Sequence, residues 1–185
     1  GNHDFDNGID GLLAQMPYAK FNFISANYDF TNTVLYGLTE PYKIYEKDGI
    51  KVGVYGLGIQ LAGLVTKQLY KETVFLDPYE LATDMETKLK EEEKCDLVIC
   101  LSHLGYEYNS VQKPDDLKLA KRTKFTDLII GGHTHTFLDK PTVVTNAAER
   151  EILVNQVGCF GVNLGRIDFY FDNKNTKANG YTIKV

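Results

Sequence analysis

The sequence predicts an α/β fold, and three observations favour it. Short apolar runs typical of strands alternate with stretches whose apolar residues recur at helical spacing. Two such runs, residues 96–101 and 127–130, share one design, with an acidic residue at the entry and a histidine beyond the exit. A helical stretch over about residues 115–124 separates them, as in the crossover between parallel strands. The 185 residues, 43% of them apolar, fit one globular unit.

The first 27 residues predict a loop, a helix and a strand. Residues 1–8 form a polar loop rich in coordinating and titratable groups, and no earlier strand or helix holds this loop in place. Apolar residues at helical spacing predict a helix over residues 9–19, with Pro17 marking its end or a kink. Residues 21–27 predict a strand with a polar exit.

The middle of the chain predicts a β-hairpin and a capped helix. Two alternating runs, 42–46 and 50–57, flank an Asp-Gly turn. The Gly-Leu-Gly sequence at 56–58 lacks the phosphate-loop patterns and is interpreted as a tight strand exit. Asp-Pro-Tyr-Glu at 77–80 offers an N-cap, a proline at the first helical position and a glutamate three residues after the cap. We therefore expect a helix to begin there.

The last fifty residues predict short alternating strands separated by turns rich in Asn, Gly and Lys. The strands are expected at 142–146, 151–157, 164–171 and 181–185. Together they fit an antiparallel closing sheet.

Charge, hydropathy and cysteine count exclude several classes of protein. A formal net charge of −5 argues against a protein that coats nucleic acid, although a small anionic substrate held by metal ions is compatible with it. No run approaches the roughly 18 to 20 apolar residues that span a bilayer. The three cysteines, Cys95, Cys100 and Cys159, are odd in number and lack CxxC spacing, so we expect small buried or half-buried residues.

The four histidines of the chain all lie in Gly-, Asn- or Ser-flanked stretches that are typical of strand exits. Because the carboxyl ends of parallel strands meet at one edge, His103, His133 and His135 are expected to converge. Residues two apart on an extended segment point to the same side, so His133 and His135 could share one ion or bind two adjacent ions. Imidazole, carboxylate and amide donors favour Zn, Mn, Fe or Co over Ca.

The remaining histidine, His3, is a candidate proton donor. Two ions roughly 3.5 to 4 Å apart can clamp a phosphate and activate a water molecule, provided that a carboxylate bridges them. A histidine outside the metal shells, oriented by a carboxylate, could protonate the leaving alcohol and contribute about 10² to 10⁴-fold. Asp6 or Asp4 could orient His3 in this way.

Three motifs in order, GNHDFD at 1–6, SHLG at 102–105 and GGHTH at 131–135, resemble those of calcineurin-like metallophosphoesterases. The wider sequence resembles the 5'-nucleotidase branch at residues 26–29, 155–158 and 164–166. The resemblance implies a four-layer α/β/β/α sandwich. Its implied metal ligands are Asn2, His103 and His133 for one ion, with His135 a ligand or near neighbour of the other. It also makes His3 the leaving-group acid, with Asp6 rather than Asp4 as its orienting partner.

The sequence also departs from this family at both ends. The family's first two motifs, an Asp-x-His and a Gly-Asp that supplies the bridging aspartate, are expected before Gly1, and a nucleotide-binding domain is expected after Val185. We therefore interpret residues 1–185 as a partial catalytic domain that is incomplete at its N-terminus. The complete protein would hold two divalent ions (Zn, Mn, Fe or Co), and this chain at most one.

The resemblance implies metal-dependent hydrolysis of phosphate monoesters, foremost of 5'-nucleotides, by a hydroxide that two metal ions activate. The alternatives are a 2',3'-cyclic-nucleotide phosphodiesterase, a UDP-sugar hydrolase and, from another class, a non-catalytic metal-binding module. The expected partners are a nucleotide or other small phosphate ester and a C-terminal nucleotide-binding domain on the same or a separate chain, but no nucleic acid polymer. By resemblance the protein is expected to be periplasmic or extracellular.

Overall fold

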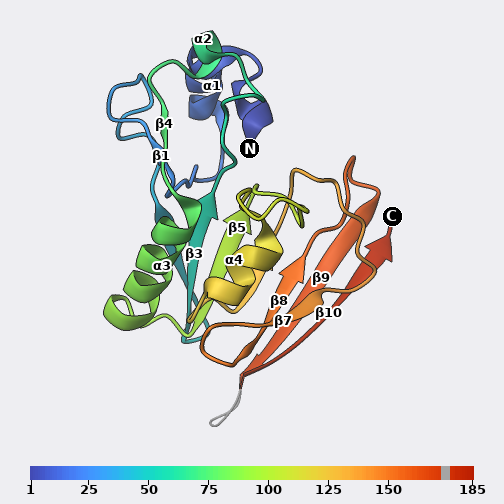
Figure 1. The fold of residues 1–185 in the computed structure, drawn as a ribbon. Helices are drawn as coiled ribbons and strands as arrows, with labels where there is room; N and C mark the ends of the chain where they lie inside the picture. Colours follow the sequence, from blue (N-terminus) through green and yellow to red (C-terminus); the bar gives the residue numbers. More distant parts are fainter. Residues whose placement is uncertain (172–175) are drawn as a thin grey trace.

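The computed structural model describes residues 1–171 and 176–185, and it confirms the α/β class. A six-stranded mixed sheet with the order β2-β3-β5-β6-β8-β7 lies at its centre (Figure 1). Its strands are β2 Tyr42–Lys47, β3 Ile50–Leu57, β5 Leu97–Ser102, β6 Leu128–Ile130, β7 Thr142–Thr145 and β8 Glu151–Asn155. Strands β3, β5, β6 and β8 run parallel, so their carboxyl ends lie at one edge of the sheet.

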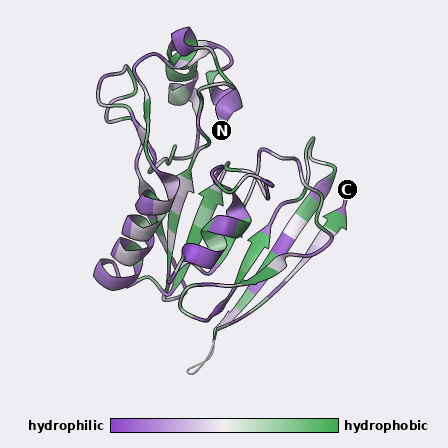
Figure 2. Cartoon of the chain, viewed as in Figure 1, coloured by the Kyte–Doolittle hydropathy of each residue, from purple (hydrophilic) through white to green (hydrophobic). Residues whose placement is uncertain are grey.

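Two helices, α3 (Pro78–Thr87) and α4 (Asp116–Arg122), cover one face of this sheet (Figure 1). Helix α3 begins where the sequence predicts, with the Asp77 side chain accepting hydrogen bonds from the backbone of Tyr79 and Glu80, and a π-helical turn (Lys88–Glu92) follows it. Ile152 and Val154 of β8 belong to the buried cluster beneath these helices. Figure 2 shows this arrangement as hydrophobic strands behind helices whose outer sides are hydrophilic.

The last two strands, β9 (Asn163–Phe171) and β10 (Thr176–Lys184), form an antiparallel hairpin. The hairpin lies on the opposite side of the sheet from the helices, since Phe169 and Ala178 line one cavity together with Val143 and Leu153. The described residues therefore form helix, sheet and hairpin layers. No helix among them is long and apolar enough to cross a lipid bilayer.

A smaller N-terminal lobe stands at the carboxyl edge of the sheet (Figure 1). It contains the 3-10 turns Asn2–Phe5 and Met16–Tyr18, helices α1 (Gly8–Gln15) and α2 (Lys67–Tyr70), and strands β1 (Tyr28–Asp29) and β4 (Val74–Phe75). The lobe has its own apolar cluster, in which Phe5 packs edge-on against Tyr28 with ring centroids 5.8 Å apart. The N-terminal loop, residues 1–8, is thus held in place by elements that follow it in the sequence.

The prediction of a strand over residues 21–27 is wrong. The backbone of this segment divides its hydrogen bonds between two neighbours: Ser25 N–H donates to the Glu40 carbonyl and Ala26 N–H to the Gly56 carbonyl, both at 2.8 Å. A strand ladder needs one partner with a continuous register. The segment therefore forms only an isolated bridge.

The predicted closing sheet is also corrected, because β7 and β8 belong to the central sheet. Strand β8 pairs with β6 in parallel and with β7 antiparallel, and of the four predicted strands only the last two, β9 and β10, form a separate antiparallel pair. Strand β8 is covered on both faces, which alternation alone does not reveal. The turn expected after Phe171 falls in part on residues 172–175, outside the described residues. As expected, Cys95 and Cys100 are buried and Cys159 is half-buried.

Candidate metal centre

Three predicted ligands meet at the carboxyl edge of the sheet. His103 directly follows β5 and His133 follows β6, and the centroids of their rings lie 5.3 Å apart. The Asn2 side chain reaches this pair from the N-terminal lobe. Its Oδ1 lies 3.2 Å from Nε2 of His103 and 3.1 Å from Nδ1 of His133. One amide and two imidazoles, far apart in the sequence, therefore converge on one point.

His3 and Asp6 lie beside this centre on the exposed face of the N-terminal turn. Nδ1 of His3 is 2.9 Å from Oδ2 of Asp6, and both side chains are largely exposed. The Asp4 carboxylate instead contacts the amino group of Gly1. The geometry thus pairs Asp6, rather than Asp4, with the His3 ring.

His135 lies further out than His103 and His133. Its side chain is exposed, and its ring lies against Phe160 with centroids 6.2 Å apart. His133 and His135 have φ angles of 70° and 52°, so the segment is not the extended one that would point both side chains to the same side. The extended backbone assumed for this segment is therefore absent. His133 contacts Asn2, as His103 does, whereas a role of His135 at a second ion stays a prediction.

The surroundings favour the neutral form of both converging imidazoles. Burial, together with the neighbouring His133, lowers the pKa of His103 to about 4. Burial and the positive charge of Lys113 lower the pKa of His133. A neutral imidazole has a ring nitrogen lone pair available, which is the form that binds a metal ion.

Gln156 holds the loop that carries His133, and it is only 2% exposed. Its Nε2 donates to the Gly132 carbonyl at 2.8 Å, while its Oε1 accepts from the Thr134 hydroxyl at 3.2 Å and from the Thr136 backbone. In the sequence, Gln156 stands out only as part of residues 155–158, a stretch that resembles the family. Its position directly after an apolar strand is the sequence signal that could have marked Gln156 as a functional residue.

A second residue behind the centre, Asp116, is fully buried in the first turn of α4. One carboxylate oxygen accepts a hydrogen bond from the Ser102 hydroxyl, and burial raises the pKa of the carboxyl to about 7. The other oxygen lies so close to Gly131 that a Cβ atom there would be 2.1 Å from it. Only glycine fits at this position. Asp116 thus contacts both histidine-bearing loops, at Ser102 beside His103 and at Gly131 before His133. In the sequence, this aspartate is recognisable only as part of a predicted helix.

The donor set fits one transition-metal ion. Two imidazoles and an amide oxygen leave positions open for water or substrate, as three protein ligands do in catalytic zinc sites. Over residues 1–171 and 176–185, no three His, Cys, Asp or Glu side chains are grouped so that they could hold an ion. The amide of Asn2 is therefore required as the third donor beside His103 and His133.

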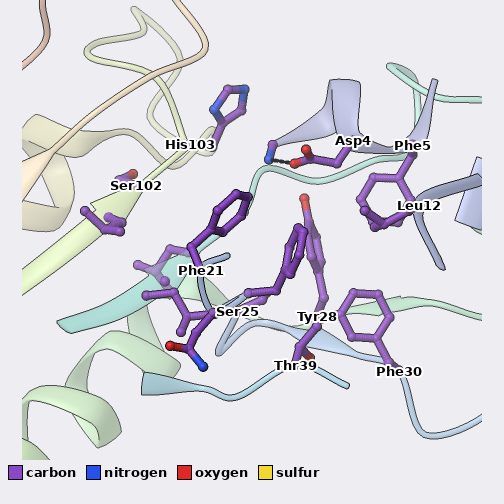
Figure 3. A pocket seen from close by; sticks show the side chains of 18 residues that line it. Asp4, Phe5, Leu12, Phe21, Ser25, Tyr28, Phe30, Thr39, Ser102 and His103 are labelled. Atoms are coloured by element: carbon purple, nitrogen blue, oxygen red, sulfur yellow. Dashed lines mark hydrogen bonds and ion pairs between the residues drawn. The ribbon is translucent and has the colours of Figure 1, made fainter. Parts of the chain in front are cut away.

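A cavity of about 410 Å³ borders His103 on the side of the N-terminal lobe (Figure 3). Aromatic side chains, among them Phe21, Tyr28 and Phe30, line it together with Asp4. Burial and the negative charge of Asp4 raise the pKa of Tyr28. The Asp4 carboxylate in this lining disfavours a bound anion.

The fold is that of a metallophosphoesterase. Residues 1–137 match the family model of the calcineurin-like phosphoesterases, and the chain belongs to this family. The resemblance noted in the sequence is thereby confirmed.

Several relatives are similar over nearly the whole chain. The trifunctional nucleotide phosphoesterase protein YfkN of Bacillus subtilis is 35% identical over 94% of the chain and 13% of its own length. The 5'-nucleotidase of Vibrio cholerae is 30% identical over 99% of the chain and 36% of its own length. The crystal structure of a 5'-nucleotidase precursor from Thermus thermophilus matches with a TM-score of 0.85 and 31% identity, covering 100% of this chain and 38% of that one. The chain thus spans well under half the length of these relatives.

Proposed function

We propose that this chain is part of a catalytic domain that hydrolyses phosphate monoesters, with 5'-nucleotides as the preferred substrates. The observation that carries the proposal is the convergence of Asn2, His103 and His133 at one sheet edge. The names of the relatives support the substrate class, since two are 5'-nucleotidases and one is a nucleotide phosphoesterase. We propose that the complete protein also carries the upstream Asp-x-His and Gly-Asp motifs and holds two divalent ions.

In this proposal each of the side chains at the site has a separate role. Bound ions supply charge stabilisation for the phosphate and activation of the attacking water. Asn2, His103 and His133 hold one ion, and His135 serves the other. Because Nδ1 of His3 faces Asp6, its Nε2 is left to donate a proton to the leaving nucleoside oxygen. The Asp6 carboxylate fixes the orientation of this imidazole through its contact with Nδ1.

Two alternatives within the enzyme class follow from the same site, namely hydrolysis of 2',3'-cyclic nucleotides or of UDP-sugars. The trifunctional relative favours a broad nucleotide specificity. A non-catalytic metal-binding module is the alternative from another class. We also propose export from the cytoplasm, which the precursor status of the Thermus thermophilus relative supports.

Phosphate release by the complete protein tests the proposal. With Zn²⁺ or Mn²⁺ present, AMP should be cleaved faster than 2',3'-cyclic AMP or UDP-glucose, and a chelator should abolish all three activities. Asn2→Ala should lower both metal content and turnover, whereas substitution of the exposed Asp84 should change neither. Metal binding without turnover of any of these substrates would favour the binding module, and faster cleavage of UDP-glucose would favour the sugar-nucleotide alternative.

A further inference from the structure

Lys113 is an exposed residue of the loop that joins β5 to α4, and it is held in place by an aromatic ring. Its Nζ lies 3.6 Å from the centroid of the Tyr108 ring, in a cation–π contact. Over residues 1–171 and 176–185, no carboxylate forms an ion pair with this ammonium group, whereas Lys118 on α4 pairs with Asp115. The positive charge of Lys113 is therefore fixed without being neutralised, and it can still bind an anion.

The loop that carries Lys113 is itself fixed from within by Lys118. The Lys118 ammonium group donates hydrogen bonds to the backbone carbonyls of Tyr108 at 2.9 Å, Ser110 at 2.8 Å and Lys113 at 3.1 Å. The buried Asp115 carboxylate accepts from this ammonium group and from the Tyr108 backbone N–H. The place of the Lys113 charge is thus set by the fold before any ligand binds, which lowers the entropic cost of using it.

The same loop lies against Thr134, the residue that directly follows His133. The backbone N–H of Tyr106 donates to the Thr134 hydroxyl at 3.0 Å. A Cβ atom at Gly105 would be 2.4 Å from the Tyr108 hydroxyl oxygen and 2.9 Å from the Thr134 methyl carbon. The Tyr108 and Thr134 side chains therefore lie close together, and they bring the Lys113 loop up to the segment that carries His133.

The charge of Lys113 acts on the metal centre itself. Burial lowers the pKa of His133, and the next largest cause is the positive charge of Lys113. Charges further apart than about 10 Å are largely screened in salt solution, so the ammonium group lies near this imidazole. A phosphate monoester carries roughly two negative charges at neutral pH, and an ammonium group is a compact cation with three donors for its oxygens. A phosphate at the centre would therefore meet this charge.

We propose that Lys113 binds an oxygen of the substrate phosphate held at the Asn2, His103 and His133 centre, and that it favours doubly charged monoesters over singly charged cyclic diesters. The inference rests on the proposed function and adds a residue that selects substrates by the charge of their phosphate. The selection follows because a Coulomb interaction scales with the product of the two charges, so that losing this cation costs a dianion about twice as much as a monoanion.

Kinetics of the complete protein test the selection. Lys113→Gln should raise the KM for AMP about tenfold, but the KM or inhibition constant of 2',3'-cyclic AMP only about threefold, with metal content unchanged. Lys113→Arg keeps the charge and should restore the ratio of the two constants. Lys121→Gln is the matched control, since Lys121 is exposed on α4, and it should change neither constant. An equal rise for both compounds, an unchanged KM for AMP or a loss of metal in Lys113→Gln would overturn the proposal.

Acetylation of lysines, read by peptide mass spectrometry, tests the contact without turnover. Inorganic phosphate should slow the acetylation of Lys113 in the metal-loaded complete protein several-fold and leave Lys121 unaffected, and removal of the ions with a chelator should abolish this protection. Equal reactivity of Lys113 with and without phosphate contradicts the inference. So does equal protection of both lysines, or protection that survives the chelator, because the anion would then be bound elsewhere. The proposed function fails separately if the unsubstituted complete protein releases no phosphate from AMP.

Discussion

At the scale of single residues, we propose that His3 donates the proton to the leaving group and that Asp6, 2.9 Å from its Nδ1, orients it. In the complete protein His3→Asn should lower kcat for AMP by about 10² to 10⁴-fold, because the leaving oxygen then departs without its proton. Asp6→Asn should cost less, since the imidazole remains. Steady-state kinetics and metal analysis on the same samples check this. A parallel loss of metal and turnover in His3→Asn would show that His3 is a ligand.

The buried Asp116 makes stability depend on pH. Its pKa is about 7 in the folded chain and near 4 when unfolded, so between these values the unfolded state binds fewer protons. The free energy of unfolding therefore falls as pH rises from about 4 to 7, by up to about 4 kcal/mol from this group. Asp116→Asn should remove that slope, as measured by urea unfolding at several pH values. The exposed Asp139→Asn should parallel the unsubstituted chain, and an equal slope in both variants would refute the assignment.

Parallel strand order predicted that His103 and His133 meet at one sheet edge, whereas Asn2 was expected beside them only from the resemblance to the family. The residues that support these side chains were not predicted. The roles of Gln156 and Asp116 depend on how two loops pack in space, and no local pattern encodes that contact. The left-handed backbone of His133 and His135 escaped prediction for the same reason, since it is imposed by the packed loop.

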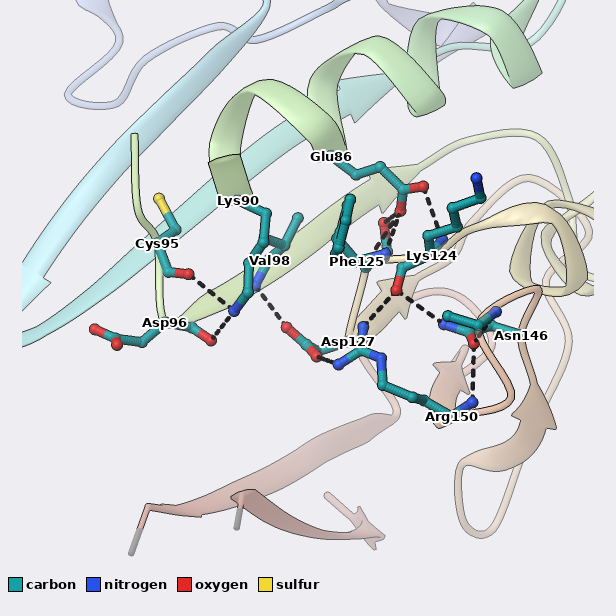
Figure 4. Close-up of polar contacts among 12 residues, drawn as sticks. Glu86, Lys90, Cys95, Asp96, Val98, Lys124, Phe125, Asp127, Asn146 and Arg150 are labelled. Carbon is teal, nitrogen blue, oxygen red and sulfur yellow. Dashed lines mark hydrogen bonds and ion pairs between the residues drawn. The ribbon is translucent and has the colours of Figure 1, made fainter. Parts of the chain in front are cut away.

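At the scale of elements, Glu86 connects helix α3 by hydrogen bonds to residues 124–126, directly before β6 (Figure 4). This carboxylate is 1% exposed and accepts hydrogen bonds from the backbone of Lys124, Phe125 and Thr126, and also from the Thr126 hydroxyl. Glu86→Ala leaves these donors unpaired and should destabilise the chain by roughly 3 to 5 kcal/mol. Denaturant unfolding measures this, with the exposed Asp84→Ala on the same helix as control. A loss below about 1 kcal/mol would mean that water replaces the carboxylate.

Elements that depend on neighbours in sequence were predicted well. The Asp77 cap and the hairpin of β2 and β3 are both closed by contacts within a few residues. Strand assignment at 21–27 and the sheet membership of β8 depend on partners far along the chain. Alternation of apolar residues identifies an extended segment, but the partner is chosen by packing of the whole sheet.

At the scale of the whole molecule, the described layers place three donors for one ion at the sheet edge. The chain alone should therefore bind one divalent ion, and saturation at roughly a hundredfold Kd should stabilise it by about 2.7 kcal/mol. Calorimetric titration gives the stoichiometry, and thermal unfolding with and without Zn²⁺ gives the stabilisation. Asn2→Ala should abolish most of this shift, because it leaves only two imidazoles.

His135→Ala is the matched variant, since His135 lies outside the converging set, and the zinc-dependent shift should persist in it. The chain alone should also release little phosphate from AMP, because a two-ion site needs a bridging carboxylate that the converging set does not supply. Two bound ions per chain, or AMP turnover comparable to that of the complete protein, would contradict the prediction that this chain holds one ion and lacks the bridging carboxylate. The second ion would then be held by residues 1–185 themselves.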